Sequence, residues 1–117
     1  MKFSLLLKRF IPLALWLTVI FLFSSFKGGE LPATTPWLGS VAHFFEYLVL
    51  GFLTGRAGQI KTRRCFCWAL IFCLFYAASD EGHQSLVADR AVSLNDWLWD
   101  AGGSLMGLIF FRLDRKN

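Results

Sequence analysis

Charged residues are scarce in this 117-residue chain: Asp, Glu, Lys and Arg make up 17% of it, whereas 56% is hydrophobic and 17% aromatic. That balance is too apolar for a small soluble domain, and the length is too short for several domains. The number of cysteines is odd, at three. This argues against a disulfide framework and against a structural zinc site. Internal repeats, low-complexity tracts and glycine-rich phosphate loops are also missing from the sequence. The composition therefore predicts a single integral membrane domain spanning residues 1–117.

Four apolar stretches can each form a membrane-spanning helix, for which roughly 17 to 25 residues are needed. The third apolar stretch is too short to span a membrane unless its helix continues through Asp80 to Gln84. That continuation places those polar groups at the helix end. We predict an all-α, integral membrane four-helix bundle with helices at about residues 10–26, 37–55, 65–84 and 94–111. A secretory signal is the weaker reading of the first stretch, because no small-x-small cleavage site follows it.

Lysines and arginines are distributed unevenly among the segments that flank these stretches. Only Lys27 and Arg90 lie in the first and third loops. The other ten of the twelve precede the first helix, fill the second loop or follow the fourth helix: Lys2, Lys8, Arg9, Arg56, Lys61, Arg63, Arg64, Arg112, Arg115 and Lys116. The positive-inside rule then predicts a multi-pass protein of the cell membrane with both termini in the cytoplasm. The lipid bilayer is the expected partner. Nucleic acid is not an expected partner, because the lysines and arginines are scattered at helix ends and are not gathered on one surface with stacking aromatic residues.

Seven ionisable residues lie within or at the ends of the apolar stretches. Each costs about 2.5 to 3.5 kcal/mol at a helix centre, so such residues are tolerated mainly where they meet partners or a substrate. In the predicted topology, all of them fall in the outer half of the bilayer or at its outer interface. They are His43, Glu46, Asp80, Glu81, His83, Asp96 and Asp100.

Helical spacing groups some of these residues with glycines. His43, Glu46, Tyr47 and Gly51 share one face of the second helix, and Asp96, Asp100, Gly103 and Gly107 share one face of the fourth helix. We predict that Asp100 faces the second and third helices and lies close to His43. The glycines form a G-x-x-x-G pair, which lets a neighbouring backbone approach closely. Packing within the chain is the favoured reading of this pair, although a homo-oligomer stays open. A structural reading also stays open, in which the polar residues only tie helices together.

The chain resembles the VanZ-like family of membrane proteins along nearly its whole length. Residues 20–25 (IFLFSS) are similar to the family's F-x-x-S-S segment, and residues 43–51 (HFFEYLVLG) to its H-F-x-E-Y-x-x-L-G block. Residues 79–84 (SDEGHQ) resemble its S-D-E-x-H-Q motif, followed in order by Arg90, Ser93, Asp96, Asp100, Gly103 and Gly107.

The resemblance implies a four-helix protein of the bacterial cell envelope. For the family's namesake it also implies low-level resistance to the glycopeptide teicoplanin, without a settled mechanism. Two positions depart from the family pattern: Gly39-Ser40 stands where many relatives have Asp-Lys, and Ala88-Asp89 where many have Pro-Gly. The first departure removes a lysine, which leaves Arg90 as the cation available to the outer site.

Two functions follow from these residues. In the first, the outer site binds or modifies a lipid-linked or anionic envelope substrate: Arg90 holds a phosphate or carboxylate, and acids and histidines transfer protons. The candidate catalytic residues are Asp80, Glu81, His43 and His83, and the candidate substrate-binding residues are Arg90, Glu46, Gln84, Asp96 and Asp100. Carboxylates with histidine also suit a divalent ion, but the sequence specifies neither a metal nor a cofactor.

The second function is a non-enzymatic structural or regulatory role, so whether the protein is an enzyme stays open. Transport is the weakest reading, because four short helices form no pore alone and the sequence has no inverted repeat.

Overall fold

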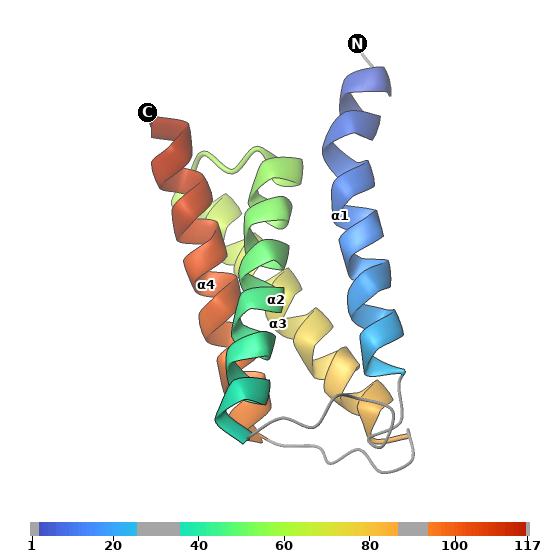
Figure 1. Cartoon of the computed structure of the whole chain (residues 1–117). Coiled ribbons are helices and arrows are strands. Elements are labelled where there is room, and N and C mark those ends of the chain that lie inside the picture. Colours follow the sequence, from blue (N-terminus) through green and yellow to red (C-terminus); the bar gives the residue numbers. More distant parts are fainter. Residues whose placement is uncertain (1–2, 26–35, 87–93, 117) are drawn as a thin grey trace.

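A computed structural model describes residues 3–25, 36–86 and 94–116 of the chain. These residues form four helices and no strand: α1 (Phe3–Ser24), α2 (Pro36–Gly58), α3 (Arg63–Gln84) and α4 (Leu94–Lys116) (Figure 1). The predicted all-α four-helix bundle is confirmed.

The helix ends differ from the prediction where basic residues flank an apolar run. α1 already begins at Phe3, and α4 continues to Lys116. The predicted bounds followed hydrophobicity, but Lys and Arg are good helix formers and extend a helix beyond its apolar part. At α3, the predicted extension to Gln84 is confirmed. Its start is set by Thr62, whose side chain accepts a hydrogen bond from the Cys65 backbone N–H at 3.1 Å.

Among the described helices, α1 and α3 are long and apolar enough to cross a membrane by length and composition. Their outward side chains suit a lipid environment: Phe75 and Trp68 on α3 are 75% and 63% exposed. α2 and α4 are equally long but include polar residues such as Glu46 and Asp100, which lower their hydropathy. Insertion of all four helices therefore stays a prediction.

Neighbouring helices in the chain run in opposite directions, so both termini lie at the same end as the α2–α3 connection (Figure 1). α2 lies centrally and packs most closely against α4. A Cβ placed on Gly103 would overlap the carbonyl oxygen of Phe44, and one on Gly107 would overlap that of Leu48. The G-x-x-x-G pair therefore packs against a helix of the same chain, and this prediction is confirmed.

The core follows the centre of the bundle and changes character along its length. Tyr47 and Leu50 of α2, Ile20 of α1 and Leu108 of α4 are completely buried. Towards the end that bears the α1–α2 and α3–α4 connections, the buried side chains become polar. These are Ser24, Ser40, Asp80, Glu81, Gln84 and Asp100.

Charge is largely segregated between the two ends of the bundle, with Asp114 the one described acid among the cations at the end that bears the termini. Two contacts hold the end with the termini together: Arg56 Nη1 donates to the Lys8 carbonyl oxygen at 3.3 Å, and Arg115 Nη1 donates to that of Ile60 at 2.9 Å. We call this the basic end; its described cations are Lys8, Arg9, Arg56, Lys61, Arg63, Arg64, Arg112, Arg115 and Lys116. The opposite, acidic end carries Glu46, Asp80, Glu81, Asp96 and Asp100. The cytoplasmic orientation of the basic end stays a prediction.

Candidate functional site

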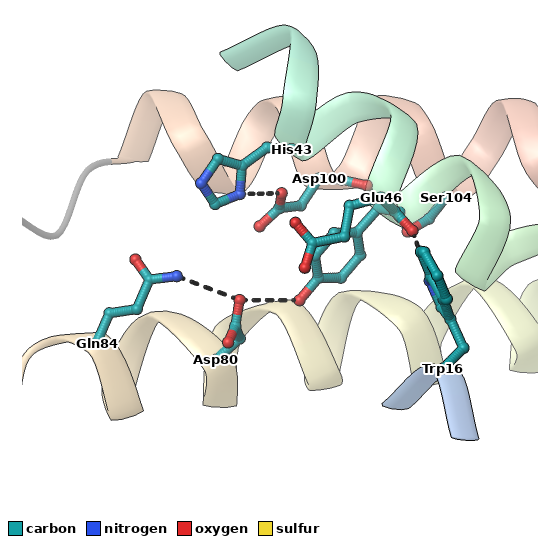
Figure 2. Close-up of polar contacts among 8 residues, drawn as sticks. Trp16, His43, Glu46, Asp80, Gln84, Asp100 and Ser104 are labelled. Atoms are coloured by element: carbon teal, nitrogen blue, oxygen red, sulfur yellow. Dashed lines mark hydrogen bonds and ion pairs between the residues drawn. The ribbon is translucent and has the colours of Figure 1, made fainter. Parts of the chain in front are cut away.

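Polar side chains from three helices converge inside the acidic end. His43 comes from α2, Asp80 and Gln84 from α3, and Asp100 from α4 (Figure 2). With Tyr47 of α2, which bonds to Asp80, they form what we call the polar cluster. These residues meet because α2, α3 and α4 each turn a polar face towards the neighbouring helices and an apolar face outwards.

The shortest contact in the cluster joins α2 to α4. His43 Nδ1 lies 3.0 Å from Asp100 Oδ1, with Asp100 fully buried and the His43 side chain 19% exposed. A carboxylate bound to Nδ1 sets the tautomer of a neutral imidazole, so that Nε2 becomes the nitrogen able to accept a proton. Within the described part of the chain, the buried Oδ2 of Asp100 has no hydrogen-bond partner.

Asp80 joins α3 to α2. Its Oδ2 accepts a hydrogen bond from Tyr47 Oη and another from Gln84 Nε2, each at 3.3 Å (Figure 2). All three side chains are buried. The two donors set the direction of the Asp80 carboxylate and offset part of the cost of burying it.

Glu46 is positioned by its place on α2 and by α1. It lies three residues after His43 on a half-buried part of the helix, and Trp16 Nε1 of α1 donates to its backbone carbonyl oxygen at 2.9 Å. A second bond, from Tyr76 Oη of α3 to the Leu17 carbonyl oxygen at 2.6 Å, also holds α1. α1 thus covers the flank of the bundle next to the polar cluster.

His83 and Asp96 take no part in the hydrogen bonds of the polar cluster described above. His83 stacks on Phe21 of α1, with ring centroids 4.6 Å apart, and its Nε2 lies 2.9 Å from Ser25 Oγ. The two histidines therefore have different partners. Asp96 lies half-buried in the first turn of α4, where the helix dipole favours an acid.

Glu81 is buried on α3, whereas Arg90 falls outside the described residues. In the described ranges, no three His, Cys, Asp or Glu side chains are grouped so that they could hold a metal ion.

Sequence reasoning assigned no contact to three residues that the structure brings to this region, although it placed one of them, Tyr47, on the same helix face as His43. Tyr47 and Trp16 donate the bonds described above, and Ser104 Oγ donates to the Asp100 carbonyl oxygen at 2.9 Å. The signal for Tyr47 was its position four residues after His43 on the same helix face. Trp16 and Ser104 carry no comparable pattern, because each finds its acceptor on backbone atoms.

A family model described as VanZ/LLP1 matches residues 7–115. The chain belongs to the VanZ/LLP1 family. The resemblance seen in the sequence motifs is thereby confirmed. No curated protein and no solved structure matches the chain.

For this VanZ/LLP1 protein, the described geometry permits two kinds of chemistry. His43, oriented by Asp100, can accept or release a proton at Nε2, and Asp80 can accept hydrogen bonds from a polar ligand. The same bonds also link α2 to α4 and α2 to α3, so they can stabilise the bundle. Ionisable residues inside apolar helices are a functional-site hypothesis by default.

Proposed function

We propose that this protein binds, and acts on, the polar headgroup of a lipid-linked or lipid-embedded envelope molecule at the polar cluster. The observation that carries the proposal is the pair between the fully buried Asp100 and the partly exposed His43. A buried carboxylate in an apolar helix is costly, and its imidazole partner keeps one edge accessible. Stabilisation alone does not require that accessibility.

In this proposal each residue has a distinct part. His43 Nε2 takes a proton from a hydroxyl of the substrate or from a water molecule, and Asp100 orients the ring and stabilises the imidazolium. Asp80, aimed by Tyr47 and Gln84, accepts a hydrogen bond from the headgroup. Arg90 belongs to the proposal as the cation for a phosphate or carboxylate.

The membrane setting completes the proposal. The protein is a multi-pass protein of the cell membrane, with its basic end in the cytoplasm, so the polar cluster lies in the outer half of the bilayer. A lipid-linked envelope precursor reaches that depth by moving laterally within the membrane. Glycopeptide resistance is one phenotype that such a protein could confer.

A structural role is the second candidate, favoured by the positions of the hydrogen bonds. Each bond of His43 and Tyr47 crosses between two helices, 57 and 33 residues apart in the chain. Bonds of this kind contribute roughly 0.6 kcal/mol each, and up to about 1.7, between membrane helices. In this alternative the cluster only fixes the arrangement of α2, α3 and α4.

The variant His43→Asn separates the two candidates. An asparagine amide can still donate to Asp100 from near the Nδ1 position, but it has no group equivalent to Nε2. The proposed function expects normal membrane abundance and thermal stability with loss of complementation in a deletion strain under cell-wall stress. Thr18→Ala, on the exposed face of α1, is the matched control. Full complementation by His43→Asn would leave the structural role as the explanation.

A further inference from the structure

The outward face of α3 carries an open groove that the polar cluster does not use. The groove has a volume of ≈ 440 Å³. Its lining is almost entirely apolar and consists of Trp68, Ile71, Phe72, Phe75, Tyr76 and Ser79. The buried side chains of the same helix, such as Ala69, Cys73 and Asp80, point the other way, into the bundle. The groove therefore lies on the side of α3 that faces the surroundings.

The dimensions of the groove match one leaflet of a membrane. From Trp68 to Ser79 the helix rises ~16 Å at about 1.5 Å per residue. A bilayer has a hydrocarbon core of about 30 Å, so one leaflet measures about 15 Å. An extended acyl chain lying along α3 would follow this path.

Unneutralised cations stand at one end of the groove. Arg64 precedes Trp68 by four residues and so lies on the same side of the helix. Lys61, Arg63 and Arg64 are all exposed, at a helix start held by the Thr62 cap. Among the described residues, no carboxylate forms an ion pair with any cation of the basic end. This end of α3 therefore offers positive charge at the level of lipid headgroups.

We propose that an anionic phospholipid binds along α3, with its phosphate at Arg64, Arg63 and Lys61 and one acyl chain in the groove. Two observations select this occupant. The charge favours an anionic over a zwitterionic headgroup, and the adjoining apolar groove favours a lipid over a soluble polyanion. Trp68, exposed next to Arg64, is of the residue type that anchors helices at the membrane interface. The site is independent of the polar cluster at the opposite end.

Native mass spectrometry of the purified, detergent-solubilised full chain tests the proposal. Phosphatidylglycerol and phosphatidylethanolamine are titrated separately, and bound lipid per protein is counted. We expect at least about tenfold preference for phosphatidylglycerol. Each cation near an anionic surface strengthens binding about fivefold, so Arg63→Gln with Arg64→Gln should weaken it about 30-fold. The control Lys8→Gln with Lys116→Gln removes the same charge from exposed positions of α1 and α4 and should change binding less than about threefold.

A groove-filling variant tests the acyl-chain part. Ile71→Trp should lower phosphatidylglycerol binding while helix content and melting temperature stay unchanged. If the double arginine variant of the charge test fails to fold, Arg64→Gln alone should weaken phosphatidylglycerol binding about fivefold. Equal losses of phosphatidylglycerol binding in the two double variants would mean that the lipid is attracted by the overall positive charge and not by a site on α3. Equal binding of both lipids, unchanged binding by Ile71→Trp, or a lipid-free dimer mass showing a second copy on this face would each overturn the proposal.

Discussion

The close approach of α2 and α4 predicts opposite effects for the same substitution at two adjacent glycines. A Cβ on Gly103 would overlap the Phe44 carbonyl oxygen and lie 3.0 Å from the Leu48 backbone nitrogen. A Cβ on Gly102 would lie 3.7 Å from the Phe44 ring, which is ordinary contact. Replacing Gly103 by Ala therefore forces two backbones apart, whereas replacing Gly102 adds a methyl group that makes ordinary contact with the Phe44 ring.

The magnitudes follow from two opposing effects. Either change from Gly to Ala gains up to about 1 kcal/mol of helix propensity. Only Gly103→Ala also incurs overpacking, which costs about 1 to 3 kcal/mol because backbone atoms cannot rotate away. The free energies of unfolding of the two variants should therefore differ by about 1 to 3 kcal/mol. For a chain of this size, that corresponds to a melting-temperature difference of about 4 to 12 °C.

Thermal unfolding of both variants in one detergent, followed by circular dichroism, measures this difference. Because the two substitutions are chemically identical and adjacent in α4, their helix propensities cancel in the comparison. Gly103→Ala should also impair complementation, since α4 carries Asp100 one turn away and its displacement stretches the bond to His43. Equal melting temperatures for the two variants would refute the close packing of α2 and α4.

Three further predictions concern the cluster, α1 and the topology. Tyr47→Phe removes a buried donor to Asp80 and should lower the free energy of unfolding by about 0.6 to 1.7 kcal/mol, measurable by thermal unfolding; an unchanged value would mean that this bond does not contribute. Trp16→Phe loses the bond that holds α1 to α2, so protease cleavage between these helices should accelerate while the melting temperature falls only slightly; unaltered cleavage would count against this anchoring. Reporter fusions after Lys61 and after Asn117 should both report cytoplasm, and an external signal from either would contradict the proposed orientation.

The helices and their packing face could be predicted because the responsible forces act locally. Apolar runs of helical length identify the helices, and the spacing of Gly103 and Gly107 identifies the face of α4 that packs. The helix ends were less accessible to prediction. α1 begins before Lys8 and Arg9, and α4 ends after Arg115, because hydrogen bonding along a helix does not stop where hydrophobicity does.

The composition of the site was largely predictable, and so was the approach of Asp100 to His43, whereas the other contacts were not. Acids and histidines in apolar helices stand out by their cost, which identified Asp80, Asp100 and His43. The same cost also drew attention to His83, which instead contacts Phe21 and Ser25 of α1. Tyr47 was placed on the face of His43, but its bond to Asp80 was not predicted, because a tyrosine in an apolar helix is inexpensive until its hydroxyl is buried.

The sequence by itself determined the four helices, the segregation of basic and acidic residues between the two ends, and the family. These features depend on composition and on contacts along a single helix. The tertiary structure confirmed that His43 meets Asp100, and it alone decided that Tyr47 meets Asp80 and that His83 turns to Ser25. These partners are 57, 33 and 58 residues apart, and their meeting depends on how far each helix is rotated about its axis. That rotation is set by the packing of whole helix faces, above all by the glycine contacts between α2 and α4. No local sequence pattern specifies it.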